Sequence, residues 1–327
     1  MKKLFMLFVA FMAVVAVKAQ QISVVSSNGS TSVHSTLQKA IEAATDGCVI
    51  YLPGGGFPIP DSVKIKNRVT IIGIGHKVKS ENADGHTTIQ GNLFFDNGSS
   101  GSAVLGTYMT GAVYIGNDGN EVDNVLVRYC NIDRVEVKND KCLGTVVNQN
   151  YLRSQSFFNG ASAELSNNIL HSVNNLDNGV ITYNIFVKTT YIYRQDNNYA
   201  GNRAMHYTDN TSIIGNVFLE WGNGPHYGSN CLASDNMAMD NWGNDPINMN
   251  GKAWKDIFVN HAGITPASDY HFKGEYQKYA SVCGIYAGTG FSDTALPPVP
   301  YIISKDIPEQ TDAQGKLNIK IRVRAGE

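Results

Sequence analysis

A short phrase of alternating apolar and polar residues recurs six times between residues 127 and 237. Each copy has an aliphatic residue, two intervening residues, a polar or thiol residue, one more residue and an apolar residue, as in VNQNYL (147–152). The fourth position is held by Cys130, Asn150, Asn168, Asn184, Asn216 and Asp235, at spacings of 20, 18, 16, 32 and 19 residues. Self-similarity at this period indicates a solenoid, in which each unit buries its apolar face only by stacking on its neighbours.

The length of the repeat decides the type of solenoid. Each unit is too short for a strand, a crossover helix and a return strand, and its apolar residues recur at period two rather than 3.6. The pattern therefore predicts an all-β protein, a parallel β-helix. The interval of 32 residues between Asn184 and Asn216 predicts two turns, one of them degenerate or carrying a loop.

Asparagine is concentrated where the repeats lie. The chain has 33 Asn residues, and 26 of them fall between positions 117 and 250. Asn tolerates the left-handed backbone region and hydrogen-bonds its own backbone, so it suits the turns of a coil. Asn side chains stacked in successive coils can also pass amide hydrogen bonds from one coil to the next. We therefore interpret the fourth-position residues as a structural ladder rather than a catalytic set.

The N-terminus has the features of a secretory signal peptide. Lys2 and Lys3 precede an apolar run of residues 4–17, and Ala19 offers a small-residue cleavage site. The run is too short for a membrane span, and no later stretch is apolar enough to be one. No cysteine follows Ala19 directly to take a lipid anchor. We expect a secreted, periplasmic or cell-surface protein whose mature chain has no transmembrane segment.

Net charge and cysteine content limit the kinds of partner and the disulfide pairing that we expect. Loss of three lysines with the signal peptide changes the formal net charge from −2 to −5, which argues against nucleic acid as a partner. The five cysteines are an odd number, so at least one thiol stays unpaired. Cys130 falls on the ladder and fits a small buried filler. No oligomerisation motif is evident, and we expect a monomer.

The segment before the repeats predicts a cap for the solenoid. Residues 35–44 place apolar side chains on one helical face, with Ser35 or Thr36 as the N-cap, and the sequences AIEAATDGCVIYLPGGGF and RVTIIGIGHK follow. This opening, together with the segment 256–274, resembles right-handed parallel β-helix proteins of the pectate-lyase-like superfamily. The resemblance covers roughly residues 22–295 and implies a single-stranded right-handed parallel β-helix with an N-terminal capping helix.

Three regions follow from this reading. They are a signal peptide (1–19), the right-handed parallel β-helix (20–295), and a Pro-rich link with a C-terminal strand (296–327). In KLNIKIRVRAGE, the apolar residues alternate with basic and polar ones, which predicts a strand with one apolar face. We expect this strand to dock on the solenoid, because about a dozen residues cannot build a core of their own.

The resemblance implies polysaccharide chemistry without identifying a catalytic set. A lyase of this fold needs a Lys or Arg base and commonly Ca²⁺ held by clustered carboxylates, while a hydrolase needs neighbouring Asp residues. Neither pattern is evident in the sequence, so the catalytic residues are unknown and no metal site is assigned. Asp123, Arg128 and Asp133 come close to one turn, but such charges usually form the rims of coils.

The best candidate for a functional region lies between residues 191 and 227, where we expect loops to project from the rigid coil. Aromatic faces stack on sugar rings, and Arg and His contact carboxylate or sulfate groups. The candidate glycan-binding residues are Tyr193, Arg194, Arg203, His206, Trp221, His226 and Tyr227, and the candidate acids are Asp196, Asp209 and Glu220. The alternative, that these aromatics pack the loops against the coil, stays open.

These observations favour a protein that engages an extracellular, acidic polysaccharide. Two mechanisms remain: a polysaccharide-lyase-like enzyme, for which Ca²⁺ is one candidate cofactor, and a non-catalytic glycan-binding, adhesive or structural surface protein. The cofactor is otherwise unknown. Convergence of the candidate Arg, His and acidic residues in one groove would favour the enzyme.

Overall fold

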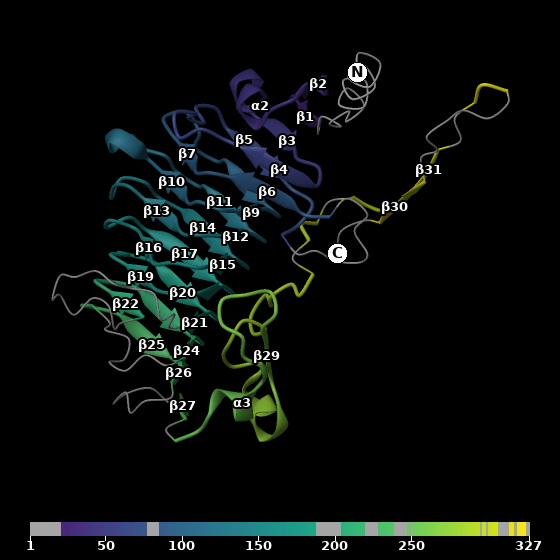
Figure 1. Cartoon of the computed structure of the whole chain (residues 1–327). Helices are drawn as coiled ribbons and strands as arrows, with labels where there is room; N and C mark the ends of the chain where they lie inside the picture. Colours follow the sequence, from purple (N-terminus) through teal and green to yellow (C-terminus); the bar gives the residue numbers. More distant parts are fainter. Residues whose placement is uncertain are drawn as a thin grey trace, which may run out of the picture.

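The computed structural model describes residues 21–76, 85–187, 204–219, 228–238, 247–249, 251–294, 296–298, 300–306, 314–316 and 319–324. The chain winds as a β-solenoid whose strands form three sheets along its length (Figure 1). The predicted parallel β-helix is confirmed. Among the described residues, no helix has the length and hydrophobicity needed to cross a membrane.

Sheet A has 11 strands, which are parallel from β3 onward. In spatial order these are β2 (Thr31–His34), β1 (Ile22–Val25), β3 (Cys48–Tyr51), β5 (Val69–Ile72), β8 (Ala103–Leu105), β11 (Leu126–Arg128), β14 (Thr145–Asn148), β17 (Ala163–Ser166), β20 (Val180–Thr182), β23 (Ser212–Ile214) and β25 (Leu232–Ser234).

Sheet B has 10 parallel strands. They are β4 (Gly55–Pro58), β6 (Thr87–Gln90), β9 (Tyr108–Met109), β12 (Asn131–Ile132), β15 (Tyr151–Leu152), β18 (Ile169–Leu170), β21 (Ile185–Val187), β24 (Val217–Leu219), β26 (Met237–Ala238) and β27 (Ile247–Asn248).

Sheet C has six parallel strands. They are β7 (Leu93–Phe95), β10 (Val113–Ile115), β13 (Val135–Val137), β16 (Ser156–Phe157), β19 (Val173–Asn174) and β22 (Met205–His206). A coil therefore passes from sheet A to B to C and back to A.

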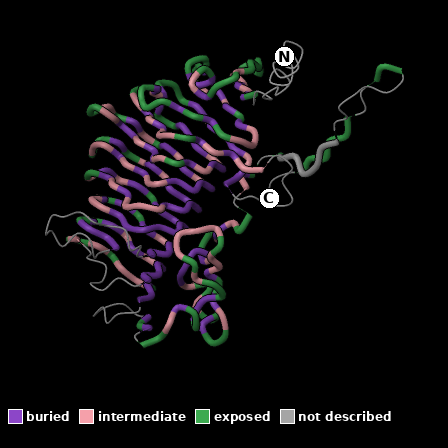
Figure 2. The backbone as a smooth tube through the Cα atoms, viewed as in Figure 1, coloured by how far each residue is buried: buried purple, intermediate pink, exposed green. Residues whose placement is uncertain are grey.

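The inward positions of the strands form continuous apolar rows. On sheet A, strand register aligns Val127, Val147 and Leu165, and all three side chains are fully buried. On sheet B, Phe186 stacks on Phe218 of the next coil, with ring centroids 4.8 Å apart. Burial follows the strands, while most exposed residues lie in the turns between them (Figure 2). Equivalent positions on successive coils therefore stack to form the hydrophobic core, which a single coil could not form alone.

Helix α2 (Leu37–Ala43) covers the N-terminal end of this core, as predicted. Thr36 is its N-cap, with the side-chain oxygen accepting the Lys39 N–H at 3.2 Å. Leu37, Ala40 and Ile41 are buried, and the helix packs against β1 and β2. The open end of the solenoid is therefore closed.

The ladder occupies the corner between sheets A and B. Asn150, Asn168, Asn184 and Asn216 are fully buried, and each donates its backbone N–H at 2.9 Å to the side-chain oxygen of the ladder residue on the next coil. Cys130 joins the same chain of bonds, because its N–H donates to Asn150 Oδ1 at 2.9 Å. All five cysteines are free thiols.

Two details of the predicted ladder were wrong. The last member is Asn236 rather than Asp235, since Asn216 donates to Asn236 Oδ1 and strand register aligns Ile213 with Ala233. Asp235 instead adopts a left-handed φ of 59° just before the ladder position. The 32-residue interval is a single coil carrying an insertion, because Asn184 bonds Asn216 directly.

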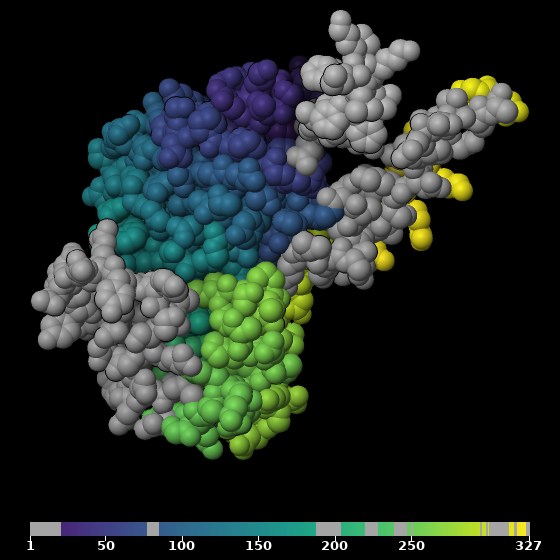
Figure 3. Space-filling model, viewed as in Figure 1, coloured from purple at the N-terminus to yellow at the C-terminus, as the bar shows by residue number. Residues whose placement is uncertain are grey.

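After the last coil, the chain turns back and covers the outer face of sheet B. This return segment (251–294) contains α3 (Trp254–Ile257), β28 (Phe258–Asn260), β29 (Asp269–Phe272) and the 3₁₀ helix η3 (Gly274–Tyr279). Its buried aromatic residues pack on the outward apolar residues of sheet B in a second cluster, separate from the interior core. In Figure 3 the return segment is the green body against the teal coils.

The residues just before the ladder positions hold the return segment in place. Asn167, at a left-handed φ of 53°, donates from Nδ2 to the carbonyl oxygens of Ile285 and Ala287, both at 2.8 Å. Gln149 Oε1 accepts the Ser292 N–H at 2.7 Å. Left-handed geometry turns these side chains away from the core, so one row fastens the return segment to the coil.

The C-terminal strand is present, but its predicted docking is not observed. β31 (Lys320–Arg324) pairs antiparallel with β30 (Tyr301–Asp306) to form a hairpin that extends away from the coils (Figure 1). Ile319, Ile321 and Val323 are each more than half exposed. The strand thus satisfies its backbone within the hairpin, and its apolar face stays uncovered.

Candidate functional site

Eight of the candidate residues lie outside the described part of the chain, in two insertions. Residues 188–203 follow β21 and hold Tyr193, Arg194, Asp196 and Arg203, and residues 220–227 follow β24 and hold Glu220, Trp221, His226 and Tyr227. β21 and β24 are adjacent strands, with Val187 aligned to Leu219. The two insertions therefore leave the coil from neighbouring strand ends, about 4.8 Å apart.

A third insertion continues this row. Residues 239–246 follow β26, which pairs with β24 on the other side. Three successive coils thus open at the same edge of sheet B, where the chain would otherwise turn toward sheet C. This edge, defined by Val187, Leu219 and Ala238, is the attachment line for the sequence stretch richest in Tyr, Trp, Arg and His.

His206 lies where the first insertion returns to the coil. It is on β22, the last strand of sheet C, and its side chain is 9% exposed. Its ring meets the Tyr207 ring edge-on, with centroids 4.0 Å apart, and Tyr207 is 65% exposed at a left-handed φ of 50°. The pair places one buried imidazole beside one projecting aromatic ring where the first insertion ends.

Asp209 follows in the turn between sheets C and A, where it supports the backbone. Its Oδ1 accepts the Ser229 N–H from the next coil at 2.6 Å, and its backbone carbonyl accepts the Thr211 hydroxyl at 2.7 Å. One carboxylate oxygen is therefore committed to fastening adjacent turns.

An outward row on sheet C leads along the solenoid to His206. Strand register aligns one residue from each of its six strands, namely Phe94, Tyr114, Glu136, Phe157, Asn174 and His206. Phe94 and Tyr114 stack with centroids 4.8 Å apart and planes 9° apart, and Lys64 Nζ lies 3.4 Å from the Phe94 centroid. The face of Phe94 turned away from Tyr114 is thus covered by a cation.

The charges beside this row neutralise one another. Arg134 donates from Nη1 to Asp133 at 2.7 Å and from Nε to Glu136 at 3.2 Å, and Lys138 also pairs with Glu136. Arg134 Nη2 donates to the Tyr114 hydroxyl at 2.9 Å. This part of the row is a closed network of partners and is best suited to stabilising the sheet.

The other charges noted in the sequence are likewise engaged with the coil. Asp123 Oδ1 accepts the Leu143 N–H at 2.7 Å, and Asp133 Oδ1 accepts the Ser154 hydroxyl at 2.6 Å. The Arg128 guanidinium lies 4.6 Å from the Tyr129 ring centroid. Within the described ranges, no group of three or more His, Cys, Asp and Glu side chains is arranged to hold a metal ion.

The sequence reasoning did not identify the sheet C row. Three of its members follow a ladder position by six or seven residues, as Glu136 follows Cys130, Phe157 follows Asn150 and Asn174 follows Asn168. Extending the repeat alignment through that offset would have found them. His206 breaks the offset because the first insertion intervenes.

No family model, curated protein or solved structure matches this chain.

Proposed function

We propose that this chain is an exported protein of the pectate-lyase-like β-helix kind that engages an acidic extracellular polysaccharide. The observation that carries the proposal is the attachment line of Val187, Leu219 and Ala238, from which two insertions with aromatic residues, the first also with two arginines, leave adjacent strands. A rigid scaffold that presents loops side by side is a common way to build an extended binding surface.

The residue types in the two insertions suit an acidic sugar polymer. Trp221, Tyr193 and Tyr227 offer flat apolar faces for sugar rings, while Arg194 and Arg203 offer planar donors for carboxylates. Both insertions hold aromatic residues, the first adds the two arginines and the second adds His226, so neighbouring coils can contact successive sugar residues. The mature chain's net charge of −5 makes these cations local features of a chain that is acidic as a whole.

A lyase-like enzyme is the second candidate, because Arg194 and Arg203 share the first insertion with the acid Asp196. A lyase uses a basic side chain to remove the proton beside the sugar's carboxylate. A calcium ion, if the enzyme used one, would be coordinated by Asp196, Asp209 and Glu220. Asp209 already gives one oxygen to the Ser229 N–H, which does not fit a preformed calcium cage, and we derive no step through the metal.

A paired screen tests the proposal and separates the candidates. The mature protein is titrated with polygalacturonate, alginate and a neutral glucan by calorimetry, and the same mixtures are followed by ultraviolet absorbance for unsaturated products. Binding to an acidic polymer without absorbance growth supports the binding protein, and growth supports the lyase. Absence of binding to both acidic polymers, or equal binding to the neutral glucan, would overturn the proposal.

A further inference from the structure

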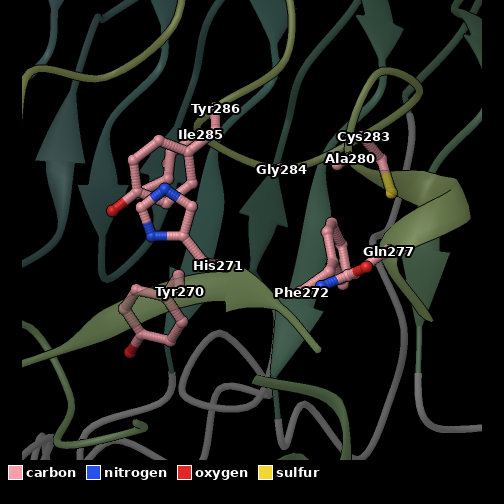
Figure 4. Close-up of a pocket in the computed structure, with 9 residues that line it drawn as sticks. All are labelled: Tyr270, His271, Phe272, Gln277, Ala280, Cys283, Gly284, Ile285 and Tyr286. Atoms are coloured by element: carbon pink, nitrogen blue, oxygen red, sulfur yellow. The ribbon is translucent and has the colours of Figure 1, made fainter. Parts of the chain in front are cut away.

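The return segment contains a pocket of about 260 Å³. It opens between β29 and the turns after η3, and its lining includes His271, Phe272, Gln277, Cys283, Ile285 and Tyr286 (Figure 4). Drug-sized ligands occupy pockets of roughly 300–1,000 Å³, so a pocket of this size suits a single small ring.

His271 is held rigidly at one end of the pocket although its side chain is half exposed. Asp269 Oδ1 accepts both the imidazole Nδ1–H at 2.7 Å and the His271 backbone N–H at 3.0 Å. The imidazole also stacks on the Tyr286 ring, with centroids 3.6 Å apart and planes 15° apart. Because the carboxylate requires the proton on Nδ1, Nε2 of the neutral ring is an acceptor for a ligand.

Tyr286 is fixed in turn by a second carboxylate. Its hydroxyl donates to Asp293 Oδ1 at 2.7 Å. Burial, followed by this hydrogen bond and the charge of Asp293, raises the pKa of Tyr286 above its ordinary value, so the ring stays neutral. Two carboxylates therefore support the paired rings and make this end of the pocket unfavourable for an anion.

The opposite end of the pocket is neutral and partly polar. Gln277 is exposed on η3 and offers an amide with both donor and acceptor atoms, while Phe272 and Ile285 form buried apolar walls. Burial, followed by the Asp235 charge, raises the pKa of the Cys283 thiol to about 12, so this lining residue is no nucleophile at neutral pH.

We propose that this pocket binds one uncharged sugar ring, with His271 Nε2 accepting a hydroxyl, the Gln277 amide contacting a second hydroxyl, and the ring's C–H groups against Phe272 and Ile285. A fixed acceptor, an amide and an apolar wall are the groups that such a ring needs. The pocket is lined by residues of the return segment, and its charge preference is the opposite of that proposed for the acidic-polysaccharide surface.

The test uses the full mature protein and saturation-transfer NMR. The probes are methyl glucoside, methyl galactoside and the methyl glycoside of galacturonic acid, which carries a free carboxylate. A neutral glycoside should bind, and the galacturonate should bind at least about fivefold more weakly, as expected for a loss of about 1 kcal/mol. His271→Ala and Gln277→Ala should each weaken neutral-glycoside binding by about fivefold or more. His271→Gln, which keeps an acceptor, should retain part of the affinity.

Glu275→Gln is the matched control, because Glu275 is exposed on the same 3₁₀ helix but does not line the pocket. Circular dichroism and thermal unfolding verify that each variant is folded. Undiminished binding in both alanine variants, the same loss in the Glu275 control, preference for the galacturonate, or no binding of either neutral glycoside would overturn the assignment. Trp221→Ala should leave this binding unchanged, which keeps the result independent of the polysaccharide surface.

Discussion

Asn168 donates its backbone N–H to the side-chain oxygen of Asn184, one coil further along, at 2.9 Å. The Asn168 side chain serves the preceding coil in the same way, because its Oδ1 accepts both the N–H and the Nδ2 of Asn150. Its own Nδ2 donates to the Val147 carbonyl at 2.8 Å. Asn168 therefore satisfies buried polar groups of both neighbouring coils.

Replacing Asn168 by Leu should lower the free energy of unfolding by about 1–3 kcal/mol, because the buried donors of Asn150 lose their acceptor. Denaturant unfolding of the purified variant measures this. Asn97→Leu serves as the comparison, since Asn97 is exposed in a turn. Equal stability of the Asn168 variant and wild type would show that the ladder bonds contribute nothing net.

The attachment of the return segment depends on Asn167, which is 1% exposed. Asn167→Gly keeps the left-handed φ accessible but removes the amide, so we expect a loss of about 1–3 kcal/mol. Hydrogen exchange should accelerate at the Gly284 and Ser292 amides, which bond to the coil. Asn178→Gly is the control, because Asn178 has a similar φ of 51° and is exposed. Unchanged exchange in the Asn167 variant would contradict this role.

Cys283 should make stability fall at alkaline pH. Burial, then the charge of Asp235, raises its pKa from 9.0 to about 12. Below pH 9 the thiol is protonated in both states and has no effect. Between pH 9 and 12 only the unfolded state loses the proton, so the free energy of unfolding declines by up to about 1.4 kcal/mol per pH unit.

The matching variant is Cys283→Ala, which lacks the titrating group. Between pH 9 and 12 its free energy of unfolding should decline less steeply than that of wild type. The smaller side chain can change the free energy by a constant amount, but it does not change this difference in slope. Urea unfolding at several pH values provides both curves. Parallel curves would mean that the thiol has an ordinary pKa in the folded protein.

The polysaccharide surface is tested by Trp221→Ala and Arg203→Ala. Each should weaken binding of an acidic polymer by about 1–3 kcal/mol, the range for a central aromatic or Arg anchor. The Arg203 change should also flatten the salt dependence, because screening acts on charge pairs and barely on stacking.

Arg68→Ala is the charge control for these variants, since Arg68 pairs with Asp46 in an exposed turn near the N-terminal end of the coil. Both insertion variants should fold normally. If either unfolds, that residue packs the loop instead of binding, and if both bind like wild type, the insertions are not the site.

The C-terminal strand shows how far local pattern reasoning reaches. Alternation in KLNIKIRVR predicted a strand correctly, because side chains on a strand alternate at period two wherever the strand lies. Alternation does not say which strand it pairs with, because that depends on how the rest of the chain folds. In the structure β31 pairs with β30 instead of docking on the solenoid. The His271 pocket draws on residues 270–286, and it forms only where β29, η3 and the turn at Tyr286 fold against one another.

The sequence by itself determined the coil, the capping helix and the identity of most ladder residues, because stacking identical units turns a short local pattern into a core. The tertiary structure alone decided the register at Asn236, where an Asp–Asn pair offers two residues suited to a left-handed turn and only pairing with Ile213 and Asn216 selects one. It also decided that Asn167 and Gln149 face outward to hold the return segment, because left-handed φ reverses the side-chain direction that simple alternation would assign.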